Sequence, residues 1–266
     1  MRWLSHTFVA TALFGLAINP AMASAQGKVS PCPDRGTSDR PSHCEVREFQ
    51  VPVSGASLTV DATPNGGISV RGWDRNEIQV RATVSANADT QQEADALAAD
   101  VRVSADGGRI HSDGRRVDHG GWSVSFEVMV PPTHALHLTT TNGGISVKDV
   151  QSQVEFDTAN GGISLANVNG NVRGRTNNGG VRVELAGSSW LGQGLDVQTH
   201  NGGIQLAVPE GYSAHLETGT TNGGLRCDFP LTLQGTLGRD LSVDLGQGGP
   251  TVKLRTVNGG VSITRR

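Results

Sequence analysis

The tripeptide Asn-Gly-Gly recurs seven times along the 266-residue chain, and this repetition constrains the fold more than any other feature. The copies begin at Asn65, Asn142, Asn160, Asn178, Asn201, Asn222 and Asn258. The copies around Asn142, Asn160 and Asn178 are spaced by 18 residues. Because self-similarity at a fixed short period is the signature of a repeat architecture, we expect a stack of similar units.

Six copies share one residue pattern around Asn-Gly-Gly. Apolar residues occupy positions one, ten and twelve, and position five is always threonine: Thr140, Thr158, Thr176, Thr199, Thr220 and Thr256. Alternating apolar residues predict strands with one buried face, and Asn-Gly-Gly predicts a turn between them. The first copy has one more residue between Leu58 and Asn65, which predicts a bulge.

Two arrangements of these strands compete. Asn-Gly is a strong hairpin signal and would give an antiparallel meander. The near-constant period instead favours a solenoid whose coils have roughly three short sides. In such a stack the charges of Glu155, Arg173 and Asp196 would alternate across neighbouring coils, and the asparagines would form a ladder. We therefore predict an all-β fold, a single-stranded parallel β-helix, right-handed by the crossover rule.

The region from 51 to 134 differs from the repeats and is predicted to be a β lead-in to a repeat solenoid over 135–266. It contains the only helix signal, near 90–101. Thr90 and Glu93 fit a capping box, and Ala94, Leu97 and Val101 share an apolar face. We expect this helix to pack on the sheet or to protect an open end.

The first 25 residues have the pattern of a signal peptide, with Arg2 before an apolar stretch and Ala23-Ser24-Ala25 before the expected cleavage site. A retained N-terminal anchor is the alternative. Cleavage would place the protein in the periplasm, on the cell surface or outside the cell. No later segment is apolar over the length that a membrane span needs.

The segment from 26 to 50 is predicted to be a polar arm held by a disulfide between Cys32 and Cys44, since disulfides persist in exported proteins. Two free thiols in a loose linker are the alternative. Cys227 occupies an aliphatic position of the repeat and is predicted to be a buried, inert thiol. The net charge of −3 gives no basic field and argues against nucleic acid as a partner.

The sequence predicts no catalytic site, no cofactor-binding site and no metal site. His134 and His137 should lie on opposite faces of a strand, which argues against a zinc site. The serine and arginine residues at position eleven do not fit a calcium-binding repeat.

Two further sets of residues are candidates for glycan cleavage or glycan binding. Glu155, Asp157 and Asp196 share a face as glycan-cleaving carboxylates would, but Arg173 and Arg175 stand among them and favour structural pairing. The tryptophans are candidate sugar platforms or core residues: Trp73, Trp122 and Trp190.

Several motifs together resemble a known family. They are Arg71-Gly72-Trp73-Asp74, Val130-Pro131 and the repeated Thr-x-Asn-Gly-Gly. Over 48–266 the chain resembles the bacterial putative-adhesin family of unknown function, a β-strand-repeat domain similar to the head domains of autotransporter adhesins. The resemblance implies a parallel β-helix exported by bacteria and implies no catalytic residues.

We therefore expect an exported, non-catalytic scaffold, adhesin-like, that binds an envelope protein, a glycan or the cell envelope. A β-helix enzyme acting on polysaccharide is the first alternative. A self-assembling envelope filament subunit is the second, and we expect a monomer or weak end-to-end self-association.

Overall fold

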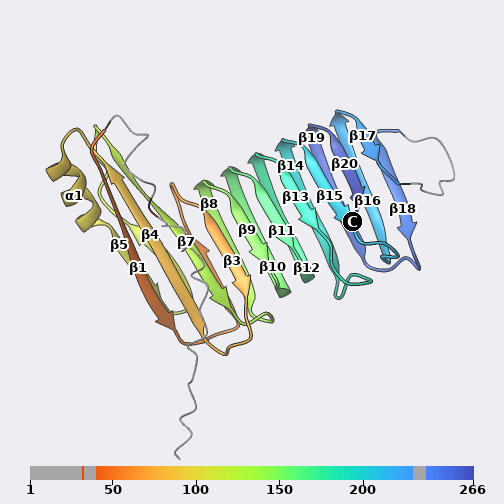
Figure 1. Ribbon diagram of the computed structural model, residues 1–266, viewed down its shortest axis with the longest axis horizontal. Helices are drawn as coiled ribbons and strands as arrows, with labels where there is room; N and C mark the ends of the chain where they lie inside the picture. Colours follow the sequence, from red (N-terminus) through yellow and green to blue (C-terminus); the bar gives the residue numbers. More distant parts are fainter. Residues whose placement is uncertain (1–31, 33–39, 230–237) are drawn as a thin grey trace, which may run out of the picture. The chain divides into compact units, whose positions relative to one another are not determined.

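Each repeat folds into one coil that contributes a long strand to one sheet and a short strand to a second sheet (Figure 1). The computed structural model describes Cys32 and residues 40–229 and 238–266, all within one unit, 31–266. The expected signal peptide lies outside the described residues. In the central coil, β10 (Gln151–Asn160) leads through Gly161-Gly162 into β11 (Ile163–Ala166). Coils therefore have two strand-bearing sides, whereas the 18-residue period had suggested three.

The described strands form two long mixed sheets. Sheet A contains, in spatial order, β1 (Ser42–Val51), β4 (Ile78–Asn87), β7 (Gly121–Val130), β3 (Ile68–Gly72), β9 (Ile145–Lys148), β11 (Ile163–Ala166), β13 (Val181–Glu184), β15 (Ile204–Val208), β20 (Val261–Arg265) and β17 (Leu225–Cys227). Sheet B contains β18 (Asp240–Leu245), β16 (Ala214–Asn222), β19 (Thr251–Asn258), β14 (Gly194–Asn201), β12 (Asn169–Asn178), β10 (Gln151–Asn160), β8 (Ala135–Asn142), β2 (Ser57–Asp61), β6 (Arg109–Asp113) and β5 (Arg102–Asp106).

Neighbouring coils pair in parallel and in register. Val154 of β10 lies opposite Leu136 of β8 and Val172 of β12, so equivalent apolar positions stack on one another. These side chains point between the two sheets and form one continuous core. The prediction of a mostly β, solenoid-like fold is confirmed, with one helix in the part of the chain that the structure describes. Tight hairpins at Asn-Gly-Gly are not what joins the coils.

The spatial order of the coils departs from the sequence order near the C-terminus. Strand β19 pairs with β14 on one side and with β16 on the other, and β20 lies between β15 and β17. The last coil in the sequence is therefore inserted between the two coils that precede it (Figure 1). A strictly sequential stack, which the sequence interpretation assumed, is wrong at this point.

Antiparallel strands lie at three of the four ends of the two sheets, and the fourth end, in sheet A, is β17, which pairs in parallel with β20. Strands β1, β4 and β7 pair antiparallel in sheet A, as do β5 with β6 and β16 with β18 in sheet B. Strands β2 and β3 pair in parallel with β8 and β9, so the first Asn-Gly-Gly copy belongs to the same stack as the later ones. The extra residue of that copy falls between Asp61 and Asn65, where ladder pairing with β8 is interrupted.

Helix α1 (Gln91–Asp100) is the one helix of the described residues, and its N-terminus has the predicted capping box between Thr90 and Glu93. Leu97 and Ala98 pack against Ala86 of β4. At the other end of the helix, the guanidinium of Arg47 donates hydrogen bonds to the carbonyl oxygens of Ala98 (3.1 Å) and Val101 (2.5 Å). These bonds satisfy carbonyls that a helix end leaves without partners.

The second half of the expected polar arm is a strand rather than a loose segment. Residues 42–51 form β1, which pairs along its full length with β4. Charged side chains such as Glu48 and Arg81 form an ion pair across this pair of strands, at 2.9 Å. Charges are tolerated here because β1 is an edge strand, and charges on an edge discourage pairing with other chains.

Candidate functional site

The seven asparagines of the turns form one hydrogen-bonded ladder along the stack. Each Nδ2 donates to the Oδ1 of the neighbouring asparagine at 2.8–2.9 Å, in the spatial order Asn222, Asn258, Asn201, Asn178, Asn160, Asn142 and Asn65. All donors point the same way, so the ladder ends at Asn65. Within the described part of the chain, the side-chain amide of Asn65 donates no hydrogen bond.

The threonine at position five is buried and ties each coil to the next. Thr158 Oγ1 donates to the carbonyl oxygen of Gly143 at 3.0 Å, and Thr176 Oγ1 donates to that of Gly161 at 2.8 Å. The same bond recurs in the other four copies. A buried hydroxyl without a partner is costly, so this bond explains why the position accepts threonine in each copy.

The outer face of sheet B has a column of alternating charge at position two of the repeats. We call it the charge column; in spatial order it contains His137, Glu155, Arg173, Asp196, Lys253 and Glu217. Lys253 lies 3.4 Å from Glu217, and His137 lies 3.6 Å from Glu155. The alternation depends on the inserted coil, because Asp196 and Glu217 would otherwise be adjacent like charges.

The candidate carboxylates for glycan cleavage lie next to basic side chains on sheet B. Asp157 accepts a hydrogen bond from Arg175 at 2.6 Å, and Asp196 lies between Arg173 and Lys253 in the strand register. The ion pair of Asp157 with Arg175 is the structural pairing that the sequence favoured.

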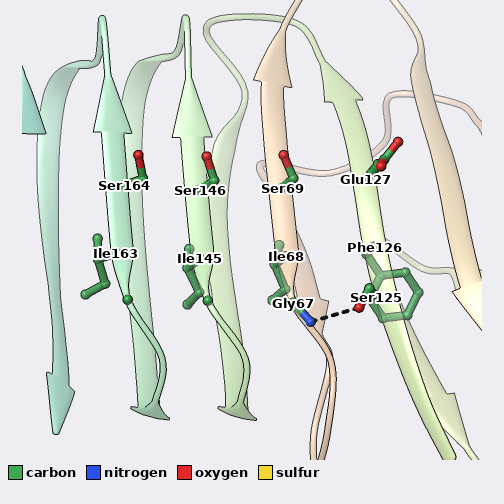
Figure 2. Close-up of a pocket in the computed structure, with 12 residues that line it drawn as sticks. Gly67, Ile68, Ser69, Ser125, Phe126, Glu127, Ile145, Ser146, Ile163 and Ser164 are labelled. Atoms are coloured by element: carbon green, nitrogen blue, oxygen red, sulfur yellow. Dashed lines mark hydrogen bonds between the residues drawn. The ribbon is translucent and has the colours of Figure 1, made fainter. Parts of the chain in front are cut away.

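A shallow groove lies on the outer face of sheet A (Figure 2). Ser69, Ser146 and Ser164 form a row in the figure, and the groove encloses about 530 Å³. Ser125 Oγ accepts a hydrogen bond from the backbone N–H of Gly67 at 3.1 Å. Glu127 at the groove's edge lies 3.5 Å from Arg81, so its charge is partly compensated. The groove offers a flat row of hydroxyls rather than a set of converging groups.

A serine, a histidine and an aspartate that sequence analysis did not single out form a chain of contacts on β16 and β18. The Nδ1 of His215 lies 2.7 Å from Asp244 Oδ1, and its Nε2 lies 3.2 Å from Ser242 Oγ. The order of groups is that of a nucleophile, a base and an orienting acid. The antiparallel pairing of β16 with β18 creates this arrangement. No sequence pattern indicates that pairing, because residues 215 and 244 are far apart along the chain.

The three candidate tryptophans lie in different environments. Trp190 is 2% exposed and belongs to the core, with its Nε1 donating to the Gly170 carbonyl oxygen at 3.1 Å, so burial excludes it as a surface platform. Trp73 is partly exposed, and the Arg75 guanidinium lies over its ring at 4.8 Å. Trp122 is partly exposed and packs beside α1 and Val117.

Two cavities meet at Trp122. One encloses about 530 Å³ and includes His43, Cys44 and Asn87 in its lining. The other encloses about 460 Å³ and includes Asp113 and Arg116. Both are lined by a shared set of four residues, which we call the Trp122 cleft: Asn65, Gly120, Gly121 and Trp122.

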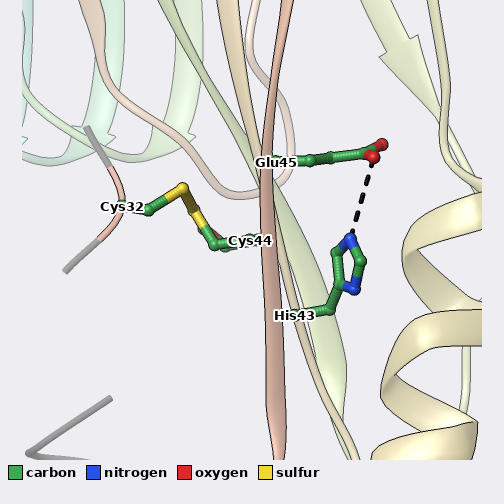
Figure 3. Close-up of a disulfide and its surroundings, with 5 residues drawn as sticks. Cys32, His43, Cys44 and Glu45 are labelled. Atoms are coloured by element: carbon green, nitrogen blue, oxygen red, sulfur yellow. Dashed lines mark hydrogen bonds and ion pairs between the residues drawn. A yellow bond between two sulfur atoms is a disulfide. The ribbon is translucent and has the colours of Figure 1, made fainter. Parts of the chain in front are cut away.

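A disulfide joins Cys32 to Cys44, with their Cα atoms 5.8 Å apart, and it forms part of the wall of the first cavity (Figure 3). Next to it, His43 lies 3.7 Å from Glu45 and 2.8 Å from Asp95. Cys227 is free and partly exposed rather than fully buried. It lies on β17, the last strand of sheet A among the described residues, where no further coil covers it.

Three titratable groups have shifted pKa values with clear physical causes. Burial raises the pKa of Tyr212 to about 12 and lowers the pKa of His134, which is 8% exposed. Burial alone would raise the pKa of Asp61, but hydrogen bonds from Thr63 and the nearby Arg109 outweigh it and hold the pKa below its usual value. Each of these shifts follows from local packing.

No group of three or more His, Cys, Asp or Glu side chains in the described residues is arranged to hold a metal ion. His134 is buried, whereas His137 lies exposed in the charge column, so their rings are not paired. Across the same described ranges, no helix has the length and apolar character needed to cross a membrane.

Residues 39–264 match the family model described as Toastrack DUF4097. The chain belongs to the Toastrack DUF4097 family. The match confirms the resemblance to a β-strand-repeat family of unknown function. No functionally curated protein matches the chain.

Solved structures give a looser likeness to this Toastrack chain. A "putative cell adhesion protein" from Clostridium sporogenes is 8% identical, with a TM-score of 0.45 over 84% of this chain and 100% of the other. A "putative adhesin" from Bacteroides fragilis is 9% identical, with a TM-score of 0.43 over 84% of this chain and 97% of the other.

Proposed function

We propose that this Toastrack chain is an exported, non-catalytic scaffold, adhesin-like, that binds a protein, a glycan or another cell-envelope partner through its outer surface. The observation that carries the proposal is the charge column on sheet B. Its positive and negative side chains alternate in register along the stack, so that each lies beside a charge of opposite sign. Such a regular surface suits binding to a partner. A catalytic centre needs groups that converge on one reacting atom.

Export is supported by the N-terminal sequence and by the disulfide. The Cys32–Cys44 bond would persist in an oxidising compartment and would be reduced in the cytosol. A bacterial host that expresses the whole chain should therefore yield processed protein outside the cytoplasm with both thiols oxidised. Unprocessed cytoplasmic protein with two free thiols would contradict export.

The binding role is tested with envelope fractions of a bacterial host. Labelled protein should bind one fraction saturably, and treatment with protease or with periodate should show whether the partner is protein or glycan. A variant with Glu155→Lys and Asp157→Lys tests the sheet B face, because it reverses two neighbouring negative charges there. The absence of saturable binding to every fraction would overturn the proposal.

One observation favours a second candidate function, the hydrolysis of an exposed ester. Ser242, His215 and Asp244 have the contacts that a base needs to activate a serine hydroxyl. A fluorophosphonate probe would then label Ser242, and Ser242→Ala would abolish the label. Equal labelling of the wild type and of Ser242→Ala would exclude this function.

The two remaining alternatives have less structural support. Cleavage of polysaccharide needs two carboxyl groups that flank one glycosidic bond, whereas Asp157 is held in an ion pair with Arg175. Filament formation needs open coil ends. Antiparallel strands lie at three of the four sheet ends, and only β17 of sheet A leaves a parallel coil edge uncovered among the described residues. Sedimentation that shows assembly increasing with concentration would favour the filament.

A further inference from the structure

We propose that the Trp122 cleft is a binding site for a neutral oligosaccharide. The proposal deepens the scaffold function by assigning a ligand class and a place, and it rests on that function. Its evidence is that Trp122 and Asn65, the donor end of the asparagine ladder, line the same two cavities. Their volumes, about 530 and 460 Å³, are in the range of ligand sites.

The ring of Trp122 is held in place from one side. Its Nε1 donates to the carbonyl oxygen of Arg115 at 2.9 Å. Gly114 lies against the ring so closely that a Cβ there would come within 2.8 Å of a ring carbon. Gly114 and Arg115, which contact the ring, line the second cavity. The fixed ring can pack there against the C–H face of a sugar without first losing rotamer freedom.

Asn65, which lines the same cavities as Trp122, supplies a hydrogen-bond donor. Its Oδ1 accepts from Asn142, while its Nδ2 is the donor terminus of the ladder and donates to no other group among the described residues. Hydrogen bonds in a chain polarise one another, so the terminal N–H is a stronger donor than an isolated amide. A sugar hydroxyl or an acetamido oxygen is an acceptor that fits this position.

The backbone is open where the two cavities join. A Cβ added to Gly121 would meet no atom within 4 Å, so the position faces open space. Gly120 has a φ of +120°, and a Cβ there would lie 2.2 Å from the Asn87 carbonyl oxygen. Gly121 therefore lines both cavities without a side chain that would occupy them, and Gly120 is held to glycine by its φ and by the Asn87 carbonyl.

The charges near the cleft favour a neutral ligand over an anionic one. The His43 ring lies 2.8 Å from the Asp95 carboxylate, and Arg115 pairs with Asp100 at 2.8 Å. Asp113 and Arg116 contribute one charge of each sign to the second cavity. A phosphate or sulfate would meet no excess of positive charge, whereas a polyhydroxylated ligand needs none.

The test measures binding of three neutral probes, chitohexaose, cellohexaose and maltohexaose, by calorimetry on the oxidised protein. At least one should bind saturably. Asn65→Asp keeps the acceptor for Asn142 but removes the donors, and Gly121→Leu fills the open space. Each should weaken binding at least tenfold, and Trp122→Ala should abolish it, with the circular dichroism of Asn65→Asp and Gly121→Leu unchanged.

A matched control should leave the affinity unchanged. Trp73→Ala removes a partly exposed tryptophan that lines neither cavity. The proposal is overturned if no probe binds the wild type at 5 mM, which is tenfold above a weak Kd of about 0.5 mM. It is also overturned if Asn65→Asp and Gly121→Leu bind like the wild type, or if a heparin hexasaccharide binds more tightly than every neutral probe. Saturable binding to envelope fractions together with any of these results would leave the scaffold function standing and remove this site.

Discussion

At the scale of single residues, the repeat is a set of positions with different tasks. The threonine at position five donates to a carbonyl of the neighbouring coil, and the asparagine at position seven builds the ladder. The sequence showed that these residues recur and that asparagines would stack. It did not show the threonine's partner, because that carbonyl belongs to a residue 15 positions away in the Thr158 case.

Tyr212 offers a direct test of packing at this scale, because it is the only tyrosine of the chain. Burial raises its pKa to about 12, above the value of about 10 in an unfolded chain. The neutral ring therefore stabilises the fold fully below pH 10, and this contribution is lost as the pH rises from about 10 to 12. Absorbance at 295 nm should show no tyrosinate at pH 10.5. Half-ionisation near pH 10 in folded protein would contradict the burial of Tyr212.

At the scale of strands and turns, alternation of apolar residues predicted most strands, and the capping box at Thr90 predicted α1. The two-sided coil was missed because a period of 18 residues divides equally well into two unequal strands and two turns. The second turn has its own signal, which was overlooked. Asp149 and Asn167 occupy equivalent places with φ of 58° and 51°, and their side chains bond at 2.8 Å.

The two glycines of each turn should differ sharply in their tolerance of a side chain. A Cβ on Gly161 would lie 1.9 Å from the Gly143 carbonyl oxygen, whereas one on Gly162 would find its nearest atom, the Gly180 oxygen, at 3.4 Å. We expect Gly161→Ala to lower the free energy of unfolding by roughly 2–4 kcal/mol and Gly162→Ala by less than about 1 kcal/mol. Urea denaturation measures both. Equal losses would mean that neighbouring turns are not stacked this closely.

The charge column should be sensitive to the sign of the residue at position 253. Lys253→Glu would place three acidic side chains in a row, whereas Lys253→Gln removes the charge only. We expect the free energy of unfolding of the Glu variant to lie about 0.5–1 kcal/mol below that of the Gln variant at low salt. This difference in the free energy of unfolding should decrease in 1 M salt, because salt screens exposed charges. A Glu variant as stable as the Gln variant would show that Lys253 does not lie between Asp196 and Glu217.

At the scale of the whole described unit, the coil formed by β19 and β20 lies inside the stack. Neighbours in sequence are usually neighbours in space, and the sequence interpretation relied on that tendency. The charges at position two could have indicated the inserted coil. In a sequential order Asp196 and Glu217 would be adjacent like charges, whereas Lys253 between them restores the alternation of sign. The sequence interpretation also did not predict the antiparallel strands at the ends of the sheets. The pairing of β16 with β18, for example, joins residues that the repeat pattern does not relate.

The Trp122 cleft shows why candidate sites were harder to predict than the fold. Trp122 was a candidate from the sequence, but its relation to Asn65 depends on where the ladder ends and on β7 lying beside β3. Neither is visible in a single repeat. The contacts of His215 with Ser242 and Asp244 likewise exist only because β18 pairs antiparallel with β16 at the edge of sheet B.

The central claim is the parallel, in-register stack with its last coil inserted, and a designed disulfide tests it most directly. Asp196 and Lys253 are register partners on adjacent strands, which lie about 4.8 Å apart, within the reach of a disulfide. In a Cys227→Ser background, the pair Asp196→Cys with Lys253→Cys should oxidise to one intramolecular bond, seen by mass spectrometry of the folded protein. The pair Asp196→Cys with Glu217→Cys, two strands apart, should stay reduced. Cross-linking of the second pair and not the first would contradict the account.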